Sequence, residues 1–261
     1  MLRRCLLALV LCVAAHSALA GAFVQPEGML LVIHESSFSG SLKTFDDKGR
    51  LVPVSDYRKF TLDTVLEYGV LDRLTLLGRL EAVNVKAEGP PGAYYRGPGM
   101  TELGARVELG SALNRDLVFS AQAMLRLPGA RVTNGATAGL TLLEADLRLM
   151  AGGSFEVNDQ PGFWSAEAGP RKRGGGAPDD WRVEIATGLA LFDRLQAIAQ
   201  SFHVFTKRTD LDPASQSHKA QLSLVLNPGR SWSLQAGVFR TLAGVNARRD
   251  SGLLIAFWRR M

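Results

Sequence analysis

The sequence predicts an all-β fold, a transmembrane antiparallel up-and-down β-barrel of about twelve strands. The clearest indication is the segment Met100–Leu127, in which apolar and polar residues alternate in two arms around the polar turn Gly110–Arg115. Alternation over more than four residues is typical of a strand, because successive side chains point to opposite faces, so this segment is predicted to be a hairpin. Similar hairpins recur along the chain, and long polar connections alternate with short ones. This repetition predicts a barrel whose apolar face meets lipid.

The first twenty residues have the features of a secretory signal peptide. Arg3 and Arg4 begin it, an apolar run follows from Cys5 to Ala15, and Ala18-Leu19-Ala20 forms a small-residue cleavage site. We therefore expect residues 1–20 to be a signal peptide and residues 21–261 to form one barrel domain. Both cysteines of the chain lie in this leader, which suits a protein that crosses an oxidising compartment.

Composition excludes several function classes. The net charge of +5 includes the two leader arginines and is too small to indicate binding to nucleic acid. No later apolar run is long enough for a membrane helix, so any span must be built from strands. The sequence has no metal-ligand spacing, phosphate loop or cofactor fingerprint, and we expect no cofactor.

Alternation and turn signals place twelve strands in order, with loops predicted at Gly40–Asp56, Gly89–Gly99 and Pro128–Ala138. Gly152-Gly153 interrupts the alternation, which predicts a bulge or a kink before a turn at Asn158-Asp159. A secreted β-sandwich would also explain alternating strands, but not the long and short rhythm of the connections. The predicted strands lie within Met29–Ser37, Tyr57–Val70, Leu74–Ala82, Met100–Leu109, Leu117–Leu127, Leu143–Leu149, Gly162–Arg171, Trp181–Leu189, Leu195–Thr206, Ala220–Leu226, Trp232–Val238 and Ser251–Arg260.

Charged residues of both signs occupy the face opposite the apolar one, and we expect them to line the barrel interior. Pairing Gly110 with Val118 would place Glu102 opposite Arg126, an arrangement that stabilises a sheet by about 0.2–1 kcal/mol. The lining is either a hydrophilic channel or an ion-pair network that fills the lumen. The predicted lumen-lining residues are Asp63, Glu67, Arg79, Glu81, Glu102, Arg106, Glu108, Gln122, Arg126, Glu144, Asp146, Arg148, Glu167, Arg171, Arg182 and Glu184.

Over residues 21–261 the chain resembles the small Gram-negative outer-membrane barrels, and the stretch RGGGAPDDWR at Arg173–Arg182 resembles uncharacterised proteobacterial members. The resemblance implies the bacterial outer membrane, contact with its lipid and lipopolysaccharide, and recognition of the last strand by the barrel-assembly machinery. Phe257 and Trp258 match that aromatic strand, but Arg259-Arg260-Met261 follow where these proteins usually end in Phe.

Aromatic and basic residues suggest contacts with the membrane surface. Aromatic residues near strand ends are expected to form interfacial girdles. Arg171-Lys172-Arg173 and Arg248-Arg249 form basic tips that could meet lipid A phosphates, although such runs are more often simply solvated. The predicted girdle residues are Trp164, Trp181, Trp232, Trp258, Tyr57 and Tyr68.

The favoured function is a narrow passive channel for small polar or charged solutes, without enzymatic activity. A structural or surface-interaction barrel is the second hypothesis. A membrane-embedded lipid hydrolase is the third, with Ser201 and His203 on the lipid-facing side of one strand and His218 on the next. Residues two apart on a strand are about 6.5–7 Å from each other, so contact is not assured. About seven residues precede the first strand, which we judge too few for an internal plug.

Overall fold

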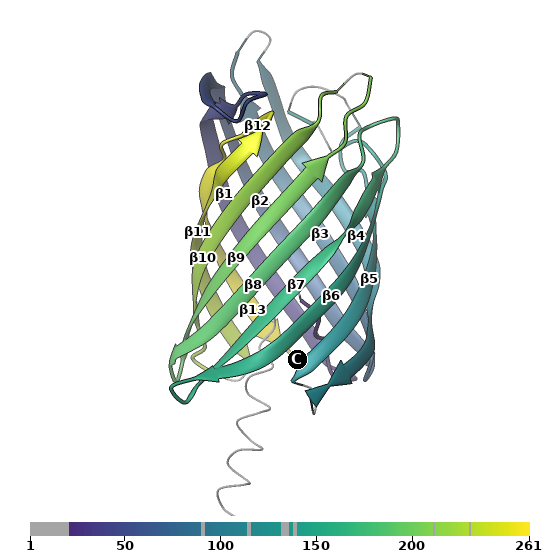
Figure 1. The fold of residues 1–261 in the computed structure, drawn as a ribbon, viewed down its shortest axis with the longest axis vertical. Coiled ribbons are helices and arrows are strands. Elements are labelled where there is room, and N and C mark those ends of the chain that lie inside the picture. The colour runs from purple at the N-terminus through teal and green to yellow at the C-terminus, as the bar shows by residue number, and fades with distance from the viewer. Residues whose placement is uncertain are drawn as a thin grey trace, which may run out of the picture.

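The computed structural model describes residues 21–89, 92–113, 116–131, 136–137, 140–210, 212–229 and 231–261. Within them the chain forms twelve long strands and one two-residue strand, and antiparallel pairing of neighbouring long strands, closed by the pairing of β1 with β13, makes a barrel of tilted strands (Figure 1). The strands are β1 (Leu30–Phe45), β2 (Leu51–Leu71), β3 (Leu74–Ala87), β4 (Ala93–Ala112), β5 (Leu117–Leu127), β6 (Glu144–Val157), β7 (Gln160–Arg173), β8 (Asp180–Phe192), β9 (Leu195–Thr206), β10 (Ser215–Leu226), β11 (Trp232–Val245), β12 (Ala247–Arg248) and β13 (Ser251–Arg260). The predicted fold class is confirmed.

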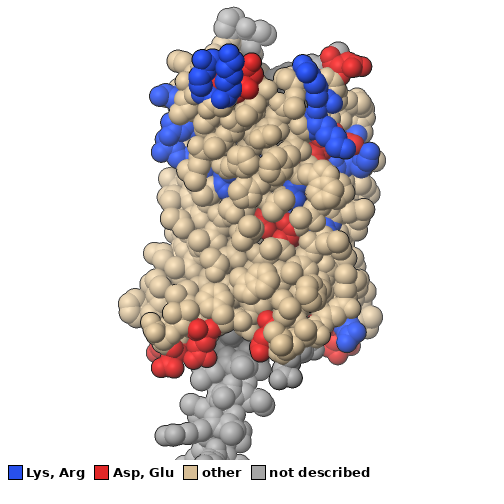
Figure 2. Space-filling model, viewed as in Figure 1, with Lys and Arg blue, Asp and Glu red and all other residues tan. Residues whose placement is uncertain are grey.

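The barrel is apolar outside and charged inside. Leu149 and Leu224 are 67% and 50% exposed, whereas Glu67 and Arg106 are each only 2% exposed. Figure 2 shows the outer surface as a broad band without many charged side chains, with Lys, Arg, Asp and Glu gathered near both ends. A soluble sheet would show the reverse, so the burial pattern suits a wall surrounded by lipid. No helix in the described part of the chain is long and apolar enough to cross a membrane.

The two ends of the barrel differ in their connections. One end, which we call the short-turn end, has the two-residue turns at 72–73, 158–159 and 193–194. Leu30 and Met261 also meet there, through a hydrogen bond of 2.8 Å from the Leu30 amide to the Met261 carbonyl. The opposite, long-loop end includes the connections at 128–143 and 207–214. This rhythm is that of transmembrane barrels.

Several strands are longer than the sequence predicts. The predicted loop Gly40–Asp56 is wrong, because β1 and β2 continue as a paired hairpin up to Phe45 and Leu51. The predicted loop Gly89–Gly99 is likewise shortened, because β4 already begins at Ala93. Polar residues in these segments do not end the strands. Antiparallel backbone pairing continues beyond the band in which apolar and polar residues alternate, so loss of alternation does not mark the end of a strand.

Two predictions of register are wrong. Pairing stays in step through Gly152 and Gly153, so no bulge occurs there. The bulge lies instead in β4 between Glu108 and Gly110, and Gly110 therefore pairs with Phe119 rather than Val118. In the part of β4 that precedes this bulge, the predicted pairing of Glu102 with Arg126 is confirmed.

Two of the predicted girdle aromatics face the interior. Trp258 is 2% exposed and packs in a cluster of buried apolar side chains. Tyr57 pairs with Ser41 on the inward side of the wall. Both residues were predicted to belong to the girdle because they lie near a strand end. Whether a side chain points to lipid or to the lumen is decided instead by its position in the alternation of the strand. Trp181 and Tyr68 are 47% and 44% exposed on the outer surface.

Candidate functional site

The strand register places the predicted lumen residues on the inward side of β2 to β8. Cross-strand pairs such as Arg79 with Glu102, and Asp146 with Arg171, bring opposite charges together on this side. The side chains form three connected groups, which differ in their position along the barrel and in what they contact.

The first group runs across β2 to β5. The Arg79 Nε lies 2.8 Å from the Asp63 Oδ1, and its Nη1 lies 3.7 Å from the Glu102 Oε1. The Arg126 Nε donates to the same Glu102 oxygen at 2.8 Å, and Arg126 also contacts Glu144. Acid and base therefore alternate around the wall, which leaves each inward charge with an opposite neighbour.

The second group continues on β6 to β8. The Arg171 Nη1 donates to the Glu144 Oε2 at 3.0 Å, and its Nε donates to the Asp180 Oδ1 at 3.1 Å. The Arg173 Nη2 also lies 3.1 Å from Asp180. Arg171 and Arg173 are thus wall residues with carboxylate partners, and the prediction of a basic loop tip at these two positions is wrong. Lys172 faces outward and pairs with Asp179 at 2.8 Å.

Arg148 joins the carboxylates of three strands. Its Nε lies 2.8 Å from the Asp146 Oδ1, its Nη1 lies 3.0 Å from the Glu184 Oε1, and it also contacts Glu167. Arg182 lies nearby, with its Nη1 3.8 Å from Asp146. Since Glu167 and Glu184 are direct cross-strand neighbours, the Arg148 guanidinium offsets the repulsion between them.

The third group binds the segment that precedes β1. Arg106 pairs with Glu67 at 3.3 Å and donates through its Nη1 to the carbonyl of Phe23 at 2.9 Å. The Gln25 Nε2 donates to the Glu67 Oε2 at 2.8 Å, and the Gln25 amide donates to the Thr75 hydroxyl at 2.7 Å. Residues 21–27 therefore lie inside the barrel at the short-turn end.

This placement corrects the expectation that seven residues are too few for an internal plug. Seven residues can extend over roughly 20 Å, enough to cross the inward faces of several strands. Ala22 is fully buried and accepts a hydrogen bond from Ser120 on β5. A Cβ at Gly152 would lie 3.1 Å from the Ala22 Cβ and 3.2 Å from the Phe23 ring. The glycine that interrupts the alternation thus makes room for this segment.

Apolar side chains fill much of the same end of the lumen. Leu31, Ile198, Val225 and Trp258 are each at most 2% exposed, although they face inward from β1, β9, β10 and β13. Together with residues 21–27 on the other side, this cluster narrows the short-turn end.

The connection after β5 narrows the opposite end. Ala130, Ala136 and Leu140 are buried against the inward residues Val83 and Met100. The amides of Gly129 and Ala130 both donate to the Leu140 carbonyl at 3.0 Å, which holds the described part of this connection in a compact turn.

A cavity of about 540 Å³ remains in the lumen between these two ends. The charged groups of β2 to β8 line one side of it. The other side has Phe202, Val204, Phe239 and Leu254, together with polar groups that include Lys219. The cavity can therefore hold solvent and small polar or charged solutes.

Sequence reasoning missed several inward charges. Glu35 and Lys59 lie within predicted strands, but neither was included among the lumen residues, Glu35 because alternation in β1 is weak. Arg173 and Asp180 lie between two predicted strands, and Lys219 precedes the predicted start of the tenth strand. Longer strands would have revealed these last three residues, because each lies on the inward parity of its strand.

Ser201 and His203 face outward from β9, as predicted, and the structure brings them into contact with each other. His218 lies directly opposite His203 on β10. The His203 Nε2 is 3.3 Å from the Ser201 Oγ, and its Nδ1 is 2.8 Å from the His218 Nδ1.

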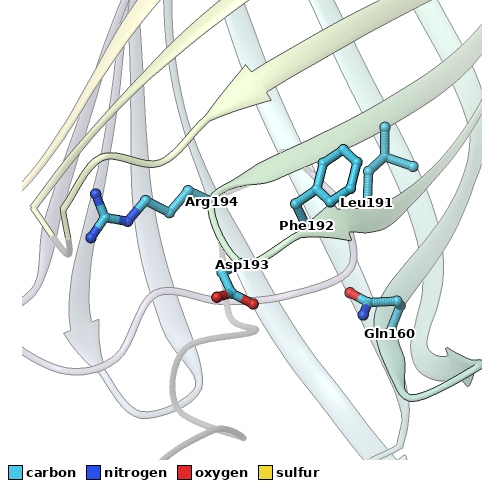
Figure 3. A pocket seen from close by; sticks show the side chains of 5 residues that line it. All are labelled: Gln160, Leu191, Phe192, Asp193 and Arg194. Atoms are coloured by element: carbon cyan, nitrogen blue, oxygen red, sulfur yellow. The ribbon is translucent and has the colours of Figure 1, made fainter.

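A second hollow, of about 440 Å³, lies at the short-turn end, and its side chains do not point toward a common centre (Figure 3). Its lining residues come from the β8–β9 turn and the start of β7, and Figure 3 shows the side chains of Asp193, Arg194 and Phe192 pointing in different directions. No group of three or more metal-ligating His, Cys, Asp or Glu side chains occurs among the described residues.

No family model matches the sequence, and no curated protein matches it. The structure is similar to the COG4313 outer membrane channel from Pseudomonas putida F1, with a TM-score of 0.74 and 14% identity over 94% of this chain and 100% of that one. It is also similar to the β domain of the Bordetella autotransporter Brka, with a TM-score of 0.59 and 13% identity over 90% of this chain and 100% of that one. The chain has the fold of the outer-membrane β-barrels. At these identities the likeness concerns the fold alone.

Proposed function

We propose that this protein is a channel of the bacterial outer membrane for small polar or charged solutes. The observation that carries the proposal is the cavity of about 540 Å³, lined by charged side chains inside an apolar wall. An interior that only filled space would not need to keep such a volume open to water. The similar solved structure is described as an outer membrane channel, which supports the same class.

The fold also suggests an orientation. In outer-membrane barrels short turns face the periplasm and long loops face outward, with both ends of an even-stranded barrel in the periplasm. The short-turn end of this barrel, where Leu30 meets Met261, is then periplasmic. We expect the outer surface to contact outer-membrane lipid and lipopolysaccharide, and β13 to be the strand that the assembly machinery recognises.

In the state described here we infer that the channel is closed at the periplasmic end. The segment of residues 21–27 contacts the inward faces of β2 to β5 through hydrogen bonds that Arg106 and Ser120 donate to it and that Gln25 donates to the wall. Residues 21–27 are not part of any strand, so this segment can leave the lumen without breaking the pairing of the barrel wall. Each hydrogen bond contributes about 0.5–1.5 kcal/mol net, and only a few hold the segment.

Removal of residues 21–27 tests the channel directly. We expect the shortened chain, which begins at Gly28 two residues before β1, to show a single-channel conductance several times that of the chain beginning at Gly21. The measurement is ion current across a planar bilayer after refolding. His34→Ala is the matched control, because His34 lies on the outer surface, where its ring contacts the Thr64 hydroxyl. Its conductance should equal that of the parent.

A structural barrel without transport is the second candidate, and the narrowed short-turn end favours it. The same experiment separates the two functions. If both the parent and the shortened chain fold and insert but pass no current, the interior is an ion-paired filling and the channel proposal fails.

A further inference from the structure

We propose a second activity on the opposite side of the wall, a hydrolytic site for acyl esters of membrane lipid. Ser201 is the nucleophile, His203 is the general base, and His218 is the residue that positions His203. All three lie on the lipid-facing side of β9 and β10, and the proposal is independent of transport through the lumen.

The three side chains form a connected relay. The Ser201 Oγ is 3.3 Å from the His203 Nε2, and the His203 Nδ1 is 2.8 Å from the His218 Nδ1. A nucleophile within hydrogen-bonding reach of a base, with the base held by a third group, is the signature of an activated hydroxyl. The longer of the two distances is usual before substrate binds, since such contacts tighten in the complex.

The proposed reaction requires one tautomer of each ring, and the two contacts accommodate it. For Ser201 to give up its proton, the His203 Nε2 must be the acceptor, and its Nδ1 must then carry a proton. In this state the Nδ1–H donates to the His218 Nδ1, and His218 carries its own proton on Nε2. We infer that the role of His218 is to stabilise this tautomer of His203.

His34 shows that this arrangement is not general for histidines on this surface. It also faces outward, and its Nδ1 lies 3.0 Å from the Thr64 hydroxyl. Among the described residues, no side chain forms a hydrogen bond with the His34 Nε2. His34 and Thr64 thus provide a hydroxyl–histidine pair without a positioning group, within the same barrel.

The relay lies near the level where lipid esters meet water. Phe205, two residues further toward the long-loop end, contacts the His218 ring edge-on at 5.5 Å between centroids. Trp181 is the cross-strand neighbour of Phe205 on the same surface. Aromatic residues of this kind mark the membrane–water boundary. Ester groups and the water that hydrolysis consumes are both available there.

Arg240 supplies a cation beside the nucleophile. Ser201 pairs with Ala220, and Ala220 pairs with Arg240 on β11, so only a methyl group separates Ser201 from Arg240 along this line. Arg240 is exposed on the lipid-facing side. A guanidinium in this position suits a phosphate group of the lipid. The substrate class is therefore an acyl ester that carries a phosphate, either a glycerophospholipid or lipid A.

The reaction balances with water as the only co-reactant. The Ser201 oxygen attacks the ester carbonyl and its proton passes to the His203 Nε2. This proton then goes to the departing alkoxide as the acyl C–O bond breaks, which leaves an acyl-serine and a free alcohol. Water attacks the acyl-serine and gives a proton to His203, which returns it to Ser201 as the fatty acid leaves.

A serine-reactive fluorophosphonate and two substrates test the proposal on the refolded chain beginning at Gly21. We expect one adduct, located at Ser201 by mass spectrometry, and no adduct in Ser201→Ala. His203→Ala should label and hydrolyse a chromogenic short-chain ester at least 100-fold more slowly. His34→Ala is the matched histidine control and should behave as the parent. Circular dichroism confirms that each variant is folded.

His218 and Arg240 need readouts that a merely structural role would not change. His218→Ala should lower kcat at least tenfold with KM unchanged, and His218→Asn should restore part of it, because its amide oxygen can still accept the Nδ1–H. Arg240→Ala should raise KM for glycerophospholipid vesicles or for lipopolysaccharide, whichever is the substrate, but not for the neutral ester. An unlabelled parent, or hydrolysis that persists in Ser201→Ala, would overturn the proposal.

Discussion

An arginine on one face of a strand has a different environment from an arginine placed one residue away. Arg106 points into the lumen, where Glu67 and Gln122 contact it. Its neighbour Val107 points outward, is 40% exposed, and pairs with Ala121 on β5. The period of two in a strand thus decides whether a charge is paired or faces lipid.

Arginine substitutions can measure this difference. Val107→Arg and Ala121→Arg should each lower the free energy of unfolding by about 2–4 kcal/mol, the usual cost of a cation on the lipid face near the bilayer midplane. Ser37→Arg should cost much less, because Ser37 lines the cavity and its strand also carries Glu35. Urea unfolding in lipid vesicles provides the values. Equal costs at Ala121 and Ser37 would contradict the assignment of the two faces.

Gln122, a predicted lumen residue on β5, is a less suitable inward position for this comparison. The Gln122 Oε1 accepts from the Arg106 Nη2 at 3.0 Å and from the Arg106 Nε at 3.1 Å. A second arginine there would face Arg106 directly. Parity predicted the side of the wall correctly, but it carries no information about which neighbour a side chain touches.

At the scale of the hairpin, Asp46 organises the turn between β1 and β2. Its Oδ1 accepts from the amides of Arg50 and Lys48 at 2.8 and 2.9 Å, and its Oδ2 accepts from the Arg50 guanidinium. Gly49 has a φ of 75°, which a residue with a Cβ adopts less readily. Hydrogen bonds from the Arg50 amide first, and then from its side chain and Lys48, lower the pKa of Asp46 below its ordinary value.

This lowered pKa predicts a direction of pH dependence for the turn. A carboxyl whose folded pKa is depressed stabilises the folded hairpin above its ordinary pKa and loses that contribution as pH falls through the folded value. The Lys48 and Arg50 amides should therefore exchange hydrogen faster, relative to intrinsic rates, below about pH 4. Asp46→Asn keeps an acceptor oxygen without the titrating group. An unchanged pH response in this variant would contradict the role of Asp46.

Strand ends and the segment before β1 were the elements that the sequence predicted least well. Alternation identified the membrane-spanning part of each hairpin, because lipid and lumen impose opposite polarity there. Beyond that band the ends of β1 and β2 mix apolar and polar residues without a regular alternation, so the pattern no longer shows where pairing stops. Residues 21–27 have no periodicity at all, and their place depends on Arg106, Thr75 and Glu67, which lie far away in the chain.

At the scale of the molecule, the wall separates two different surfaces by the thickness of one sheet. The lumen side carries the alternating acids and bases, while the lipid side carries Ser201, His203 and His218 on a mainly apolar surface. The sequence predicted both sets by parity. It could not show that the relay closes, because a contact at 2.8 Å between His203 and His218 depends on the pairing of two strands and the rotation of two rings.

The distribution of charge around the cavity makes a final prediction about ion selectivity. Glu102 and Lys219 both line the cavity, on β4 and β10. In the chain shortened by removal of residues 21–27, Glu102→Gln should lower the preference for cations, because it removes a negative charge from the lumen wall and releases Arg126. Lys219→Gln should raise it. The fields of fixed charges are focused between low-dielectric walls.

Reversal potentials under a salt gradient measure both changes, and the double variant is the control. Glu102 pairs with Arg79 and Arg126, whereas Lys219 pairs with Asp250, so the two effects should add and nearly cancel in Glu102→Gln/Lys219→Gln. Both shifts should shrink in about 1 M salt, where the screening length is only about 3 Å. Shifts of the same sign in the two single variants, or none in either, would mean that ions do not pass this part of the lumen.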